Sequence, residues 1–169
     1  MVDSLNACIG ERLLCDYAIA LKNKGYNAES IKAELDKVKY DIRVIAMIDT
    51  LEYLKKGGRI SRIVAFAGGL LSVKPILSVV DGEVKVIGKA MGEKKAYALL
   101  NNLIKENGGI DVDKPNGAVF SGIGTKNLNN FLTNYPQEWG HEVGIYGLGG
   151  TIGTHVGPGA VGVSFFCKN

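Results

Sequence analysis

Two segments of the sequence combine glycines with a side chain that could bind an anion. The first is Gly57-Gly58-Arg59, which follows the stretch Asp49–Lys56 and precedes Ser61. Glycine adopts backbone angles that other residues resist, and an arginine on a loop can direct its planar guanidinium at a carboxylate or a phosphate. The segment indicates an anion-binding loop. The simpler alternative is a helix end followed by a solvated arginine.

The second segment spans residues 147–160 and holds six glycines in the 13 residues before Ala160. Such a density predicts a sharp backbone turn or a close approach to a ligand, because glycine loses much conformational entropy on folding. We expect Thr151, Thr154 and His155 to face one opening there, with Gly157 in the turn. The histidine could bind a carboxylate or respond to a phosphorylated group. An ordinary hydrogen-bonded loop histidine is the alternative.

The glycine spacing of this second segment matches neither the dinucleotide-binding fingerprint nor the P-loop. A weaker anion site is conceivable at Ser121–Thr125, where a strand leads into a helix with exposed amide groups; a structural turn is the simpler interpretation. An enzyme domain acting on a small phosphorylated or carboxylated ligand is therefore an alternative function, although no nucleophile and base pair is evident. A third option is an interaction module that docks an acidic partner on the basic residues Lys55, Lys56, Arg59 and Arg62.

Composition limits the remaining function classes. The 169 residues are 46% hydrophobic and 22% charged, with a net charge of +3 from interspersed residues, so nucleic-acid binding has little support. No signal peptide and no membrane-spanning apolar run is visible, which predicts a cytoplasmic protein. Three cysteines and two histidines without metal-ligand spacing predict no metal site, no disulfide framework and no cofactor.

The pattern of apolar residues predicts an α/β fold. Two β-rich runs flank Asp81-Gly82, a dipeptide that favours a type I′ hairpin turn. Helical spacing is clear at residues 92–107, and a helix is also expected from Ser61 to about Leu71. Strands are predicted at residues 42–48, 75–80, 83–87, 117–121, 142–146 and 160–167. The helical crossovers between most of these strands favour parallel pairing.

These elements predict a two-layer domain with a six-stranded mixed sheet at residues 42–169. Residues 1–41 supply helices, one ended by Gly25 and one capped by Asn27, without the strands that such helices normally cover. We interpret them as the remnant of a truncated amino-terminal α/β domain. The surface exposed by truncation could drive formation of a homodimer.

The two glycine segments together resemble the DegV family. The resemblance rests on the sequence DTLEYLKKGGRIS at residues 49–61 and THVGPGA at residues 154–160. It extends to Val2-Asp3-Ser4, Lys74-Pro75-Ile76 and Asp81-Gly82, and so covers essentially the whole chain. Proteins of this family bind a long-chain fatty acid, and some present its carboxylate to a separate catalytic subunit of a fatty acid kinase. The resemblance implies a lipid-binding protein without enzyme activity of its own.

The resemblance also implies roles for individual residues. Arg59 and His155 match family positions near the lipid headgroup or the kinase-facing surface, and Thr154 and Gly157 shape the turn around the histidine. The acyl tail is expected to run among six apolar residues that also suit an ordinary core: Ile45, Met47, Ile63, Phe66, Leu70 and Ile76. The family's further Ser and Thr motifs, which help to hold the carboxylate, precede the position of Met1, so only part of the headgroup site is expected in this chain.

Overall fold

The computed structural model describes residues 1–59, 72–135 and 143–168. Its elements, in chain order, are α1 (Ile9–Asn23), α2 (Ala28–Val38), the 3-10 helix η1 (Lys39–Asp41), β1 (Ile42–Met47), α3 (Glu52–Lys56), β2 (Val73–Val80), β3 (Glu83–Met91), α4 (Glu93–Glu106), β4 (Gly117–Phe120), α5 (Lys126–Asn134), β5 (Gly144–Gly147), α6 (Gly150–Val156) and β6 (Val161–Phe166). The predicted helix from Ser61 to Leu71 lies outside the described residues.

The strands form one six-stranded sheet in the order β3-β2-β1-β6-β4-β5. The mixed sheet predicted from the sequence is therefore present, but the expectation of mainly parallel pairing was wrong. Strand β1 runs antiparallel to both β2 and β6, and among the described strands only β4 and β5 pair in parallel. Helical character between two strands does not by itself fix their relative direction, because a connection can return to a neighbouring strand from the opposite end.

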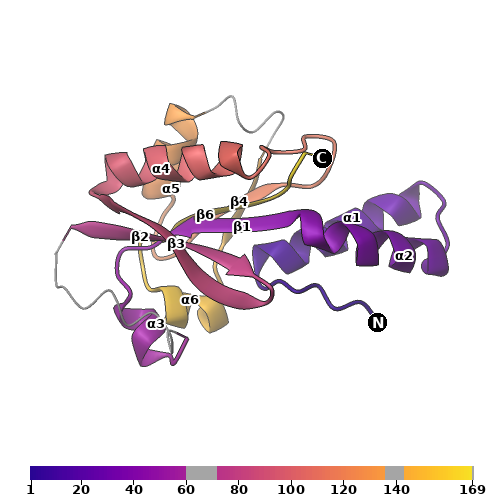
Figure 1. Cartoon of the computed structure of the whole chain (residues 1–169), viewed down its shortest axis with the longest axis horizontal. Helices are drawn as coiled ribbons and strands as arrows, with labels where there is room; N and C mark the ends of the chain where they lie inside the picture. The colour runs from indigo at the N-terminus through magenta and orange to yellow at the C-terminus, as the bar shows by residue number, and fades with distance from the viewer. Residues whose placement is uncertain (60–71, 136–142, 169) are drawn as a thin grey trace.

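One face of the sheet is covered by α4 and α5, which lie together on one side in Figure 1. Strand residues alternate between the two faces, and those of this face join the helices in the largest buried cluster. Among its members are Ile45, Met47 and Ile76 from the strands, Leu100 from α4 and Phe131 from α5. The sheet and these two helices form two layers of the fold.

The opposite face is covered in two places. Helix α1 packs over β6, β1 and β4, with Leu13 and Phe166 fully buried between them. At the other end of the strands, α3 and α6 close a smaller cluster around Ile48, Leu54 and Leu77. In Figure 1 these two short helices lie on the side of the sheet away from α4. Residues 1–41 thus share a core with the sheet, and their origin in a separate amino-terminal domain stays a prediction.

Local sequence signals explain two of the boundaries. The hairpin between β2 and β3 turns at Asp81 and Gly82, both at positive φ (54° and 76°), as a type I′ turn requires. At the start of α2, the Asn27 side chain accepts a hydrogen bond of 2.9 Å from the Ser30 amide. The predicted hairpin and this predicted cap are both confirmed.

The glycine-rich segment differs from its prediction. Residues Gly150–Val156 form the short helix α6 rather than a turn. The amides of Gly153 and Gly157 donate helical hydrogen bonds to the carbonyl oxygens of Gly149 and Gly153, at 2.8 and 2.9 Å. Glycine is a poor helix former in isolation, so this helix depends on its tertiary contacts with α3. The turn follows the helix, at Gly157, whose φ is 75°.

In the described residues no helix combines the length and the apolar character needed to cross a membrane.

Candidate functional site

The two glycine segments meet in space. Strand β1 leads through Asp49 into α3, and α3 packs against α6. Gly57, at the end of α3, lies directly against the His155 imidazole, and a Cβ atom at Gly57 would overlap Nδ1 of that ring. Gly57 has an ordinary helical φ of −78°, so the glycine is required here by the close approach and not by backbone strain. Residues distant in the sequence thus form one cluster.

Two more glycines make the same kind of contact in the turn after α6. A Cβ atom at Gly157 would overlap the ring of Tyr53, and one at Gly159 would lie 2.7 Å from a carboxylate oxygen of Asp49. Both glycines also have positive φ, of 75° and 81°, which other residues rarely adopt. The glycine spacing in both motifs therefore follows from the packing of α3 against the segment around α6.

Ser121 holds the turn at residues 157–160 through hydrogen bonds. Its hydroxyl is buried, donates a hydrogen bond to the Gly157 carbonyl oxygen and accepts one of 3.0 Å from the Ala160 amide. The Gly159 amide donates to the Ser121 carbonyl oxygen at 3.1 Å. The structural interpretation of Ser121–Thr125 is therefore the one that this geometry supports, because its serine is engaged in holding the turn.

In the cluster around α3, Asp49 and Lys56 form ion pairs, whereas Arg59 does not pair with a described acidic residue. Asp49 forms an ion pair with Lys74 at 2.7 Å. Lys56 pairs with Glu52 on the exposed face of α3, also at 2.7 Å. Arg59 is exposed, and its Nη1 donates a hydrogen bond of 2.9 Å to the Gly57 carbonyl oxygen. Among the described residues Arg59 has no acidic partner, so most of its donors are available to an anion.

His155 is half-buried in the last turn of α6, and its Nδ1 atom is buried without a hydrogen-bond partner in the described part of the chain. Thr154 is exposed, and its hydroxyl donates a hydrogen bond to the Thr151 carbonyl oxygen at 3.2 Å. A ligand-binding role for Thr154 stays a prediction. The structure brings His155, Gly157 and the Arg59 loop to one end of the sheet.

The candidate tail-lining residues lie elsewhere. Ile45, Met47 and Ile76 are at most 1% exposed and face α4 and α5, whereas the cluster of α3 and α6 packs on residues of the other face, such as Ile48 and Leu77. Their burial fits an ordinary core, and a lining role for them stays a prediction. The three remaining candidates, Ile63, Phe66 and Leu70, lie outside the described residues.

Sequence reasoning missed Tyr97 on α4. The residue is 5% exposed, and its hydroxyl has no hydrogen-bond partner among the described residues. Burial, followed by the nearby carboxylates of Glu93 and Asp49, raises the pKa of Tyr97 to about 12. Asn101, four residues further along α4, also buries an unpartnered side-chain oxygen. In the sequence, Tyr97 and Asn101 could have been noticed as polar residues within the apolar stripe of the helix.

No trio of His, Cys, Asp or Glu side chains within residues 1–59, 72–135 and 143–168 is arranged to hold a metal ion. The described cluster therefore offers a guanidinium, an imidazole and glycine-lined backbone, a set suited to binding an anionic group.

Comparison with known proteins places this architecture. A DegV domain-containing protein of Caldanaerobacter subterraneus is 36% identical over 171 residues, covering 98% of this chain and 59% of that protein. A Thermus thermophilus structure described as fatty acid binding of a DegV family protein has a TM-score of 0.83 at 30% identity, covering 99% of this chain and 60% of the other. A DegV lipid-binding protein of Thermotoga maritima superposes with a TM-score of 0.82 at 26% identity, over 96% of this chain and 57% of that one.

The chain therefore spans a little under two thirds of the length of these relatives. The family model for uncharacterised proteins of the DegV family matches residues 1–168. Family membership thus rests on both the sequence and the fold, and this chain belongs to the DegV family.

Proposed function

We propose that this protein binds a long-chain fatty acid and holds its carboxylate near Arg59 and His155. The observation that carries the proposal is the seating of His155 on Gly57, two residues before Arg59. That contact sets an imidazole beside a loop whose guanidinium has no acidic partner among the described residues. Relatives described as binding fatty acid or lipid share the fold at 26 to 30% identity, which supports the choice of ligand.

The acyl tail is proposed to run among Ile63, Phe66 and Leu70. Ile45, Met47 and Ile76 lie on the opposite face of the sheet from the His155 cluster, so they would line the tail only if it passed to that face. Each buried methylene contributes about 0.8 kcal/mol, so a long chain supplies roughly 10 kcal/mol before the costs of association. Tail burial therefore dominates affinity, and the headgroup contacts determine orientation and selectivity for a carboxylate.

The role of this binding in the cell is a further part of the proposal. As in some members of the family, the protein would present the carboxylate to the catalytic subunit of a fatty acid kinase in the cytoplasm, without catalysing the transfer itself. The exposed position of Arg59 suits such presentation, because a partner can reach the loop without unfolding it. Formation of a homodimer is likewise a prediction.

Direct binding measurements test the proposal. Delipidated protein is titrated with palmitate and, separately, with hexadecanol, which keeps the tail but lacks the charge. Arg59→Gln should weaken palmitate binding about tenfold, the effect of losing one charge-assisted hydrogen bond, and should leave hexadecanol binding unchanged. The matched control is Lys56→Gln, which removes the same charge from an exposed residue three positions earlier.

The outcomes separate the two parts of the proposal. Equal weakening by Arg59→Gln and Lys56→Gln would reduce the role of Arg59 to general electrostatic attraction. Failure of delipidated protein to bind palmitate, together with no acyl chain in an organic extract of the purified protein, would overturn lipid binding by this chain.

A further inference from the structure

A cavity lies at the end of β1 opposite to the cluster around His155. It encloses about 440 Å³ between the amino-terminal segment, the start of β1, the β2–β3 hairpin and the end of α4. Its lining is mixed, with the apolar side chains of Leu5, Ile42, Val79, Val80, Ile87 and Leu103, the polar residues Asn6, Tyr40, Ser78 and Asn107, and the charged residues Lys39, Arg43 and Asp81. A volume of about 300–1,000 Å³ is typical of small-molecule sites.

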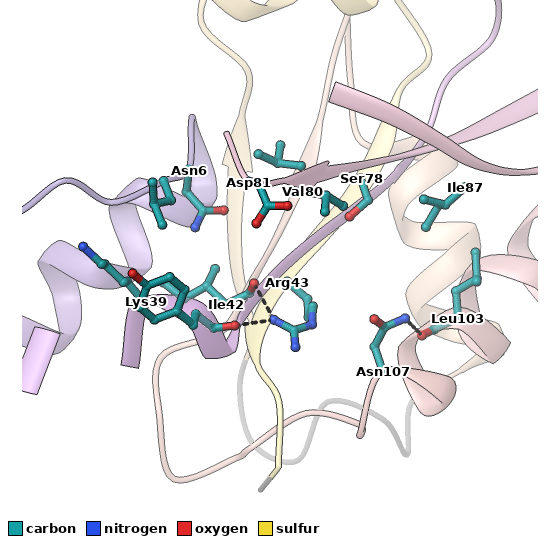
Figure 2. Close-up of a pocket in the computed structure, with 13 residues that line it drawn as sticks. Asn6, Lys39, Ile42, Arg43, Ser78, Val80, Asp81, Ile87, Leu103 and Asn107 are labelled. Carbon is teal, nitrogen blue, oxygen red and sulfur yellow. Dashed lines mark hydrogen bonds between the residues drawn. The ribbon is translucent and has the colours of Figure 1, made fainter. Parts of the chain in front are cut away.

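Arg43 is the central charged group of this cavity. Its Nη1 atom donates hydrogen bonds to the carbonyl oxygens of Tyr40, at 2.6 Å, and Ile42, at 3.1 Å. Figure 2 shows the guanidinium held in this way, between Ile42 and Asn107. The two bonds restrain the guanidinium from one side, which reduces the entropy lost when its remaining N–H groups bind a ligand.

Arg43 forms no close ion pair within the described part of the chain. No ion pair joins it to a described acidic residue, whereas the other cation of the lining, Lys39, pairs with Asp36 at 3.2 Å. Asp81 lies at the hairpin turn that borders the cavity, and no described ion pair links it to Arg43. One partly buried guanidinium thus faces a cavity that also contains one carboxylate.

The shape of the sheet contributes to the opening. The pairing of β2 with β3 shifts between Ile76 and Leu77, so that Ile87 is an extra residue on β3. Such a bulge redirects side chains and is frequent beside functional sites. Ile87 is 36% exposed and lines the cavity together with Val80 from the neighbouring strand, which is 37% exposed.

We propose that this cavity binds a small organic monocarboxylate with an apolar body, held by Arg43. The planar guanidinium matches a carboxylate, and the aliphatic walls match an apolar body. Asp81 disfavours ligands with two or more negative charges through like-charge repulsion. This site is independent of the proposed fatty-acid site, because it lies at the other end of β1 and shares no residue with the cluster around His155.

Calorimetric titration of the whole chain with benzoate tests the proposal, with benzyl alcohol and inorganic phosphate as comparison probes. Benzoate should bind at least tenfold more tightly than either probe, because only benzoate has both the single charge and the apolar ring. Arg43→Gln should weaken benzoate binding at least tenfold, and Lys56→Gln, which removes a charge outside both proposed sites, should leave it unchanged. Tighter binding of phosphate than of benzoate would show a general anion site and would overturn the proposal of a monocarboxylate ligand.

A second variant keeps the test decisive if Arg43→Gln disturbs the fold. Ile87→Trp fills the mouth of the cavity without removing a charge, and it should weaken benzoate at least tenfold. Benzoate binding that survives both variants, or that disappears with Lys56→Gln instead, would overturn the proposal. So would the absence of binding of benzoate, butyrate and acetate at millimolar concentration. None of these outcomes depends on whether palmitate binds, so the two proposals fail separately.

Discussion

The two ends of β1 are built on opposite principles. At its carboxyl end, Gly57, Gly157 and Gly159 let side chains and backbone approach so closely that no Cβ atom fits. At its amino end, Arg43 borders a cavity of about 440 Å³. The first end is specified by residues that must be small, and the second by a gap among residues of ordinary size.

This contrast explains why only one end is evident in the sequence. A requirement for glycine restricts a position to one residue type, so the packed end leaves a motif. The lining of the open end tolerates many residues of similar size, and its members come from five separate stretches of the chain. Substitutions should accordingly be costly at the packed end and mild at the open end.

The largest effect is expected for Gly157→Ala. The variant places a methyl group against the Tyr53 ring at a φ of 75° and a ψ of 179°, a conformation that residues other than glycine hardly ever adopt. Backbone strain and overpacking together should lower the free energy of unfolding by about 3 kcal/mol or more. Gly58→Ala is the control for a glycine with positive φ and no contact, because Gly58 has a φ of 68° but nothing within 4 Å. It should cost only about 1 kcal/mol in chemical denaturation. Equal losses would contradict the expectation that the packed turn restricts Gly157 more than Gly58.

Gly57→Ala should cost about 2 kcal/mol through overpacking against His155, without backbone strain. Adding His155→Ala should recover most of that loss, so that the double-mutant cycle gives a coupling well above the error of denaturation experiments. Gly149→Ala is the control, since Gly149 has a φ of −67° and no atom within 4 Å. Additive losses in the cycle would contradict the contact.

Tyr97→Phe should raise the free energy of unfolding by about 1 kcal/mol, because it removes a buried hydroxyl that has no partner among the described residues. The folded-state pKa of Tyr97 is raised to about 12, against about 10 in an unfolded chain. The stability linked to its neutral form is complete below pH of about 10 and is lost as the pH rises toward the folded value. Denaturation at alkaline pH should show a weaker decline in the variant.

The control for this prediction is Tyr40→Phe, because Tyr40 is 63% exposed. That change should not alter the stability at neutral pH. Destabilisation by Tyr97→Phe would instead indicate that the hydroxyl has a partner, such as a buried water.

The smallest effect is expected at the open end. Ile87→Thr removes apolar surface that is already 36% exposed at the mouth of the cavity, and it suits a strand. The free energy of unfolding should change by no more than about 0.5 kcal/mol. A loss as large as that of Gly57→Ala would erase the proposed difference between the two ends.

The sequence predicted the strands well because their signals are local. The run at residues 42–48, the Asp81-Gly82 turn and the apolar stripe of α4 each depend on neighbours along the chain. The predicted strand directions were wrong, because direction depends on the end at which each connection enters the next strand, and this is not a local property of the sequence. The prediction for residues 150–156 was wrong for a related reason. The glycine-rich sequence favours a turn, and the segment becomes helical only through its packing against α3.

The sequence singled out only part of the residue cluster that forms the candidate site. Arg59 and His155 stood out by residue type and glycine context, and Gly157 by its place in the turn; their role in binding stays a prediction. Their partners Tyr53, Lys74 and Ser121 gave no comparable signal, because an aromatic, a lysine and a serine are unremarkable at those positions.

By itself, the sequence determined the family, the number of strands and the two glycine motifs. These properties are encoded in residue type and in spacing over a few positions. Only the tertiary structure decided that Gly57 seats His155, that Ser121 holds the turn after α6, and that Arg43 faces a cavity at the far end of β1. Each of these depends on residues that are distant in the sequence, and their approach is fixed by how the helices pack on the sheet.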